Sequence, residues 1–313
     1  MLNTIDLFVG CGGLSEGFEQ SRKYKMIGAV EWEPSPVKEL RNHLKNRWGI
    51  QDSEERVLQF DIQRTEELFN GWKDKKFGES KGLDALVGNR QLDVIIGGPP
   101  CQAYSVAGRI RDEHGMREDY RNYLFESYLK VVQHYKPRVF VFENVPGILS
   151  AKPGDGSVRI IDLIQKAFAD AGYAVLPDLS NAIIDMTEYG VPQNRKRIII
   201  LGVSKEHYGD KAEAMVEKFY SSYLPEYKIE KKATVRDAIG DLPKLRPLDE
   251  PISYLGRKLS HSVSDPLING HISRFHNKRD IELFKFLEED IASGRMKYTS
   301  AKSLKTLLYE INR

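Results

Sequence analysis

A chain of 313 residues with 41% hydrophobic and 29% charged residues has the composition of an ordinary globular protein, with room for one large and one smaller domain. No apolar run approaches the ~18 residues of a membrane-spanning helix, and no basic segment precedes an apolar one at the start. Two cysteines cannot form a disulfide framework or a zinc site alone, so we expect a cytoplasmic protein without a metal. The net charge is only +2, so any nucleic-acid-binding surface must be a local patch.

The first predicted unit is a buried strand over residues 5–9, a glycine turn over 10–13 and a helix over 14–20. A strand, a glycine turn and a helix start form the cofactor-cradling unit of doubly wound α/β sheets, because the helix amides point at the ligand. The spacing is not that of the dinucleotide motif, and a plain loop uses the same glycines. This turn alone therefore leaves both interpretations open.

The next two predicted strands, over residues 26–30 and 57–60, end in Glu31-Trp32 and Asp61-Ile62. An acidic residue after the second strand is where such folds bind a ribose, and Trp32 could stack on an adenine. The alternative is a solvated Glu31 beside a tryptophan that packs on the sheet. Three strand ends carrying Gly, Glu and Asp meet at one crevice, which favours a nucleoside cofactor site.

Residues 64–90 are polar without a clear period and indicate an insertion or a long loop. A fourth strand, 93–96, ends in two glycines and two prolines, and Cys101 follows directly. The prolines fix the loop, so the thiol is displayed at the crevice as a nucleophile would be; a small buried cysteine is the alternative. Residues 105–121 have the length of a lid or binding segment, or of a surface excursion.

A helix over residues 122–135 precedes a fifth strand, 139–142, which ends at Glu143 and Asn144. A carboxylate at the mouth of the sheet, near a thiol, can serve as an acid. Further on we predict a helix at 158–168, strands near 174–176, 181–186 and 198–203, and then helical tendency at 212–220 and 281–291. Arg195 and Arg197 alternate along an extended segment, so both point to one side, where they could bind a phosphate or a base carbonyl, or protect an edge strand.

Six segments together resemble the cytosine-5 DNA methyltransferases, in that family's order and over about the first two-thirds of the chain. They are DLFVGCGG at 6–13, EW at 31–32, DI at 61–62, GPPCQ at 98–102, ENV at 143–145 and QNRKR at 193–197. The resemblance implies a doubly wound, Rossmann-like sheet that binds S-adenosylmethionine, with S-adenosylhomocysteine as product. It implies that the cofactor-binding residues are Phe8, Gly10, Gly12, Gly13, Glu31, Trp32, Asp61, Ile62 and Pro99.

The same resemblance implies the chemistry. The thiolate of Cys101 would add to carbon 6 of a cytosine flipped out of double-stranded DNA, because carbon 5 alone is too weak a nucleophile. Glu143 would bond ring nitrogen 3, and the arginines would hold the ring carbonyl. The catalytic residues would be Cys101, Glu143, Asn144, Arg195 and Arg197, and the residues near DNA would be Gln102, Ser105, Arg109 and Arg111.

After residue 203 the resemblance weakens, and the family's final Gly-Asn-Ser segment is missing. We therefore divide the chain into a catalytic domain, 1–203, and an incomplete, mainly helical linker and partial target-recognition region, 204–313. A second polypeptide could supply the missing segment, or the chain is truncated. His261, His271 and His276 lack the acid or cysteine partners of a metal site. The preferred function is the modification half of a restriction system; the alternatives are RNA cytosine methylation and a non-catalytic DNA-binding remnant.

Overall fold

The computed structural model describes residues 1–100, 124–152, 157–265, 267–268 and 270–311. The chain forms two compact units, Met1–Thr234 and Val235–Arg313, which are described separately. The first half of unit 1 contains β1 (Leu2–Leu7), α1 (Gly13–Gln20), β2 (Tyr24–Glu31), α2 (Pro34–Trp48), α3 (Ser53–Arg56), β3 (Val57–Gln59), α4 (Thr65–Asn70), β4 (Trp72–Asp74), β5 (Gly78–Ser80), α5 (Gly82–Val87) and β6 (Val94–Gly97).

The second half of unit 1 completes the same domain. It contains α7 (Leu124–Tyr135), β7 (Val139–Asn144), α8 (Ile160–Asp170), β8 (Tyr173–Ala174), β9 (Ile183–Asp185), β10 (Lys196–Ser204), α9 (Lys205–Tyr208) and α10 (Lys211–Lys218), with short 3₁₀ turns at Pro146–Leu149, Leu179–Ala182, Met186–Tyr189 and Pro225–Tyr227 and a π-helical turn at Phe219–Tyr223.

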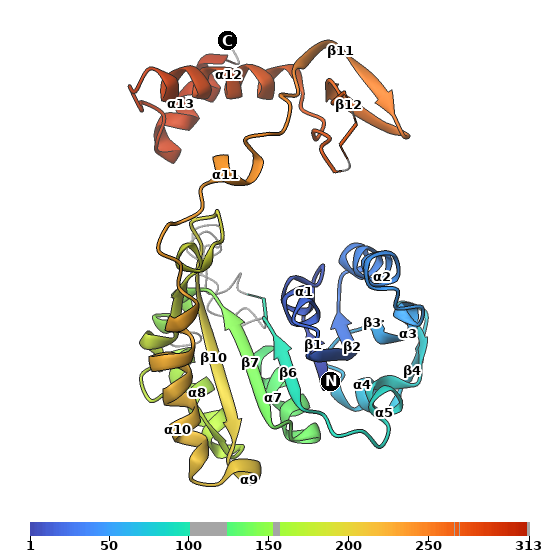
Figure 1. Ribbon diagram of the computed structural model, residues 1–313. Helices are drawn as coiled ribbons and strands as arrows, with labels where there is room; N and C mark the ends of the chain where they lie inside the picture. The colour runs from blue at the N-terminus through green and yellow to red at the C-terminus, as the bar shows by residue number, and fades with distance from the viewer. Residues whose placement is uncertain (101–123, 153–156, 266, 269, 312–313) are drawn as a thin grey trace. The chain divides into compact units, whose positions relative to one another are not determined.

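An 8-stranded sheet organises this unit, with the strand order β3-β2-β1-β6-β7-β10-β8 and β9 paired to β10 (Figure 1). Neighbouring strands from β3 to β7 are parallel, whereas β10 runs antiparallel to β7, β8 and β9. The carboxyl ends of the parallel strands therefore meet at one edge, where β10 begins. The order reverses between β1 and β6, which is where open α/β sheets bind ligands. The predicted doubly wound α/β class is confirmed.

Helices cover both faces of this sheet because the buried residues of its central strands alternate in direction. Met26 and Ala29 of β2 pack with Val37 and Leu40 of α2, whereas Ile27 belongs to the larger core on the other face. That larger core includes residues of α4, α5, α7 and α8. The strands thus read as near-continuous apolar runs, which is typical of parallel strands buried on both faces.

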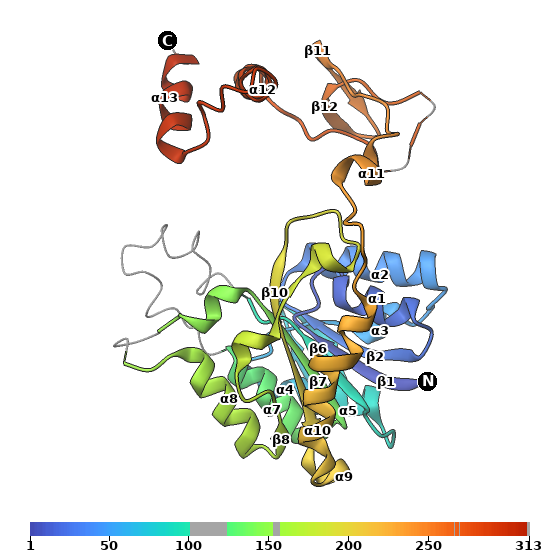
Figure 2. The same ribbon diagram turned by 60° about the vertical axis from the view of Figure 1, so that its left-hand side comes forward.

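Helix α10 extends the first unit beyond residue 203, where the sequence places the domain boundary. Ala212 and Val216 of α10 are buried, and the helix lies beside β10 (Figure 1 and Figure 2). The hydroxyl of Tyr220 donates to the carbonyl of Ile199 at 2.6 Å and accepts from the amide of Leu201 at 2.9 Å. These bonds satisfy backbone groups of β10, so this segment belongs to the sheet domain.

Of the two interpretations of residues 64–90, an insertion or a long loop, the long loop is wrong. The segment contains α4, the hairpin of β4 and β5, and α5, and it buries Leu68, Phe69, Trp72 and Leu83 in the main core. Each element is only three to six residues long. Such elements are shorter than the window over which a helical or strand period can be recognised.

Unit 2 contains α11 (Val235–Ile239), the antiparallel hairpin of β11 (Pro247–Tyr254) and β12 (Arg257–His261), α12 (Lys278–Ala292) and α13 (Ala301–Ile311). The helical tendency is confirmed, and the hairpin was not predicted. His271 contacts the carbonyl of Pro243 at 2.7 Å, and the rings of His261 and His276 lie 6.0 Å apart. Within the described ranges, no group of three potential ligands could hold a metal ion, and no helix is long and apolar enough to cross a membrane.

Asp6 gives the stability of the fold a dependence on pH. Its side chain is 1% exposed and accepts a hydrogen bond from Ser15, and burial raises its pKa from 3.8 to about 7. The folded state thus favours the neutral acid. In the unfolded chain the carboxyl group ionises near pH 4, whereas in the folded state it ionises near pH 7. The free energy of unfolding is therefore largest below pH 4 and falls as the pH rises to 7 and just above it, by about 4 kcal/mol in total.

We therefore expect wild-type protein to lose stability between pH 5 and pH 8, and Asp6→Asn to lose much less. Urea unfolding at both pH values measures this difference. Asp162→Asn, which changes an exposed carboxyl group paired with Arg159, should keep the wild-type pH profile. If the free energy of unfolding changed equally with pH in wild type and in Asp6→Asn, the raised pKa of Asp6 would be contradicted.

Candidate active site

A cavity of about 300 Å³ lies at the carboxyl edge of the sheet. It is formed where β1, β2, β3 and β6 end. Five of the predicted cofactor residues line it together: Phe8, Glu31, Trp32, Asp61 and Ile62. Its other lining residues are Val30, Glu33, Phe60, Gln63, Gly98, Pro100 and Leu124. Gly98 and Pro100 belong to the GPPCQ segment, but none of the seven was predicted to bind the cofactor. The wall therefore combines aromatic rings with carboxylates, as small-molecule sites commonly do.

The carboxylate of Glu31 is held by backbone amides. It accepts from the amide of Gly10 at 2.8 Å through Oε2 and from the amide of Glu33 at 2.9 Å through Oε1. The bond to Gly10 joins the end of β2 to the glycine turn after β1. Glu31 thus shapes the turn at the same time as it faces the cavity.

The glycine turn adopts left-handed backbone conformations that bring β1 to the cavity. Phe8 has φ 57°, Gly10 has φ 55° and Gly12 has φ 88°. A Cβ on Gly12 would lie 2.6 Å from a methyl carbon of Leu40, so this glycine lets α2 pack against the turn. The cavity wall does not include Gly10, Gly12 or Gly13, and it does not include Pro99, which is buried. Their predicted cofactor contacts stay predictions.

Glu143 and the two predicted arginines come together at the same edge of the sheet. Nε of Arg197 lies 2.7 Å from Oε1 of Glu143, and Nη2 of Arg195 lies 3.9 Å from the same oxygen. Both arginines therefore point to one side of the chain, as their alternation predicts. Glu143 and Arg197 keep 22% and 18% of their side-chain surface exposed. The pair is thus partly shielded from water.

Asn144 fixes the loop that leads to residue 101. Its side chain is buried; Nδ2 donates to the carbonyl of Pro99 at 3.2 Å, and Oδ1 accepts from the amide of Val145 at 2.9 Å. The amide side chain thereby joins the ends of β6 and β7. Asn144 therefore holds the loop after β6 in place.

Gly98 leaves the space that the Glu143 carboxylate needs. A Cβ at this position would lie 2.7 Å from Oε2 of Glu143. We expect Gly98→Ala to displace the carboxylate from Arg197 and to reduce kcat about tenfold or more, because small misplacements of reacting groups are costly. Steady-state methylation kinetics measure this loss. Gly17→Ala, at a helical glycine with nothing within 4 Å of the added Cβ, is the matched control and should keep wild-type kcat. Equal kcat values for both variants would contradict the expectation.

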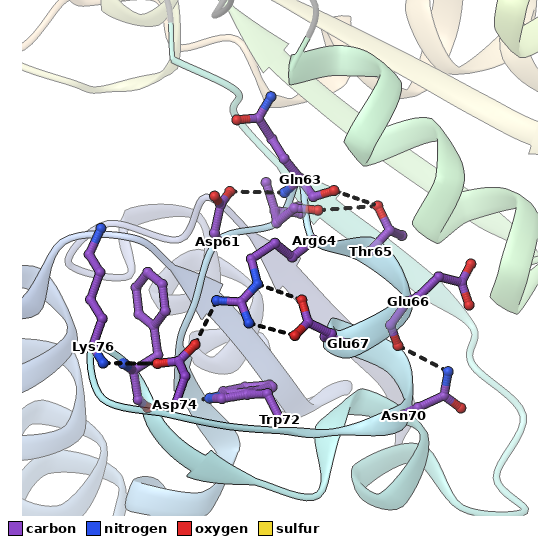
Figure 3. Close-up of polar contacts among 12 residues, drawn as sticks. Asp61, Gln63, Arg64, Thr65, Glu66, Glu67, Asn70, Trp72, Asp74 and Lys76 are labelled. Carbon is purple, nitrogen blue, oxygen red and sulfur yellow. Dashed lines mark hydrogen bonds and ion pairs between the residues drawn. The ribbon is translucent and has the colours of Figure 1, made fainter.

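A second polar cluster lies behind the Asp61 loop and was not predicted (Figure 3). The guanidinium of Arg64 donates to both carboxylate oxygens of Glu67 and, through Nη1, to Oδ2 of Asp74 at 2.6 Å. The backbone amide of Phe77 and the Arg64 guanidinium both lower the pKa of Asp74. The sequence contains no signal for this cluster beyond an arginine two residues after the resembling DI segment.

Five of the predicted site residues lie outside the part of the chain that the structure describes. They are Cys101, Gln102, Ser105, Arg109 and Arg111. The predicted lid at 105–121 falls in the same stretch. The described chain ends at Pro100 on this side, on the wall of the cavity.

The sequence matches the family model of C-5 cytosine-specific DNA methylases over residues 2–305. It is 32% identical to the type II methyltransferase M.Bpa9945I of Bacillus paralicheniformis, over 93% of this chain and 75% of that protein. It is 33% identical to the type II methyltransferase M.AgeI of Thalassovita gelatinovora, over 81% of this chain and 54% of that protein.

A longer relative and a solved structure extend the comparison. The DNA (cytosine-5)-methyltransferase PliMCI of Paracentrotus lividus is 28% identical over 87% of this chain but only 17% of its own length. A crystal structure of a candidate DNA modification methyltransferase from an E. coli prophage matches with a TM-score of 0.54 and 24% identity, over 81% of this chain and 59% of that one. This structural likeness shows the fold. The chain thus spans from a sixth to three quarters of these proteins.

Proposed function

We propose that this chain, which belongs to the family of C-5 cytosine-specific DNA methylases, transfers a methyl group to carbon 5 of cytosine in double-stranded DNA. The observation that carries this proposal is the meeting of two groups of side chains at one sheet edge. Glu31, Trp32 and Asp61 line the cavity there, and Glu143 with Arg197 lies across Gly98 from it. One group suits a nucleoside cofactor and the other a base.

The residues of the cavity fit S-adenosylmethionine, which supplies the methyl group when bound. Carboxylates at the ends of β2 and β3 can accept hydrogen bonds from ribose hydroxyls and an adenine amino group. Trp32 and Phe8 provide apolar surfaces for the purine and for the sulfonium end. Glu31 is already oriented by two amides, so little side-chain freedom is lost when it binds a hydroxyl.

The opposite side of the site would hold the cytosine. Cys101 would add to carbon 6 of the flipped base, so that carbon 5 becomes nucleophilic. Glu143 would bond ring nitrogen 3 and favour this addition, while Arg197, which pairs with the carboxylate, would hold the ring carbonyl. After methyl transfer the carbon 5 proton leaves, and the sulfur of Cys101 is eliminated.

The biological setting that we propose is a restriction-modification system, since the similar bacterial proteins are type II methyltransferases.

Incubation with methyl-labelled S-adenosylmethionine and duplex DNA tests the reaction. We expect label in DNA, recovered as 5-methylcytosine after digestion to nucleosides. Label in transfer RNA alone would replace the proposal with RNA methylation. If S-adenosylhomocysteine binds and neither nucleic acid is labelled, the enzyme assignment fails.

A further inference from the structure

We propose that Arg64 and Asp74 are positioning residues for the nucleoside end of the cavity, an inference that rests on the proposed S-adenosylmethionine site. Neither residue lines the cavity. Arg64 instead contacts the loop after β3, which lines the cavity, and Asp74 ties Arg64 to the turn between β4 and β5, which contacts Trp32 on the cavity wall. The segment 64–90, which carries both, is therefore a structural support for the cofactor site.

The first contact of Arg64 is with the cavity loop on its own side. Its guanidinium carbon lies 4.7 Å from the centre of the Phe60 ring, and its backbone amide donates to the carbonyl of Asp61 at 3.0 Å. Oδ1 of Asp61 in turn accepts from the amide of Gln63 at 3.0 Å. Phe60, Asp61 and Gln63 all line the cavity. Holding Arg64 in place therefore restricts the loop after β3.

The second contact reaches the turn between β4 and β5. Oδ2 of Asp74 accepts from Arg64, while Oδ1 accepts from the amides of Lys76 at 2.9 Å and Phe77 at 2.6 Å (Figure 3). One carboxylate thus closes the turn with one oxygen and binds the guanidinium with the other. The position of the turn is thereby tied to that of Arg64.

The turn between β4 and β5 also supports Trp32, which lies on the cavity wall with 42% of its surface exposed. The Phe77 ring meets the Trp32 ring edge-on at 5.6 Å, and Nζ of Lys76 lies 3.9 Å from the centre of that ring. Phe77 also meets Phe60 edge-on at 5.2 Å. A cation against one face of an aromatic ring restrains it. Arg64 and Asp74 therefore link both walls between which an adenine would stack.

Asp74→Asn tests this link with little other change. The amide keeps an oxygen for the two turn amides, but its NH₂ group cannot accept from Arg64. The control is Asp162→Asn at the start of α8, where Arg159 and Asp162 form a forked pair at i and i+3 like that of Arg64 and Glu67. Neither Arg159 nor Asp162 lines the cavity. Arg64→Met, which removes both ion pairs, is the second variant.

We expect Asp74→Asn and Arg64→Met to weaken S-adenosylhomocysteine binding by about tenfold in calorimetry and to raise the KM for S-adenosylmethionine by a similar factor. kcat at saturating cofactor and the KM for DNA should remain at wild-type values, as should all constants of Asp162→Asn. Thermal unfolding verifies that each variant is folded at the assay temperature.

The outcomes separate this inference from the function on which it rests. If wild-type protein does not bind S-adenosylhomocysteine, the proposed function falls. If wild type binds and Asp74→Asn binds equally well, only the positioning role is overturned. Equal weakening in Asp162→Asn, or a fall in kcat without a change in cofactor binding, overturns it as well.

Discussion

Replacement of Cys101 by alanine is expected to abolish methyl transfer, by more than about 10⁴-fold, the scale on which enzymes that depend on a covalent nucleophile lose activity without it. Without sulfur addition at carbon 6, carbon 5 of cytosine has no means of becoming a nucleophile. Binding of S-adenosylhomocysteine should persist, because Glu31, Trp32 and Asp61 are unchanged on the cavity wall. The loss should therefore appear in kcat.

A duplex that carries 5-fluorocytosine at the target position measures the covalent step directly. Fluorine cannot leave as the carbon 5 proton does, so wild-type protein should remain attached to DNA in a denaturing gel. Cys11→Ala is the matched control, because Cys11 is the other cysteine of the chain and is exposed in the glycine turn. A trapped complex with Cys101→Ala, or its absence with Cys11→Ala, would contradict the assigned nucleophile.

The sheet and one wall of the site could be predicted because their signals are local. Buried parallel strands are apolar runs, and the residues at or directly after their ends face the crevice, as Glu31 does at the end of β2. The order of these strand ends along the chain is enough to predict that they meet. Arg195 and Arg197 were predictable for the same reason, since alternation in an extended segment fixes their side.

The missed parts depend on contacts between segments that no local pattern records. Trp72 is buried because it stacks on Phe60 at 3.8 Å, although its strand has only three residues. Arg64 and Asp74 look like ordinary surface charges in a polar stretch. The hairpin of β11 and β12 is largely exposed and polar, so it lacks the apolar alternation that predicts a strand.

The second large effect is expected for Glu143→Gln. The amide cannot supply or share the proton that favours thiolate addition, so kcat should fall by about 10²–10⁴-fold, the usual contribution of a general acid or base. The Kd for S-adenosylhomocysteine should not change. Glu188→Gln, which breaks an ion pair with Lys228 of 2.6 Å, is the control and should keep wild-type kcat. Single-turnover methylation measures both variants, and equal rates would remove Glu143 from the mechanism.

The pair of Glu143 and Arg197 then distinguishes a shared role from two separate ones. Because Nε of Arg197 lies 2.7 Å from Oε1 of Glu143, Arg197→Met should release the carboxylate and slow the reaction even if the arginine never contacts the base. If the arginine acts only through Glu143, the double variant should be no slower than Glu143→Gln alone, since residues that act as a unit are not additive. A further loss in the double variant would instead assign Arg197 a contact with the cytosine carbonyl that is independent of the carboxylate.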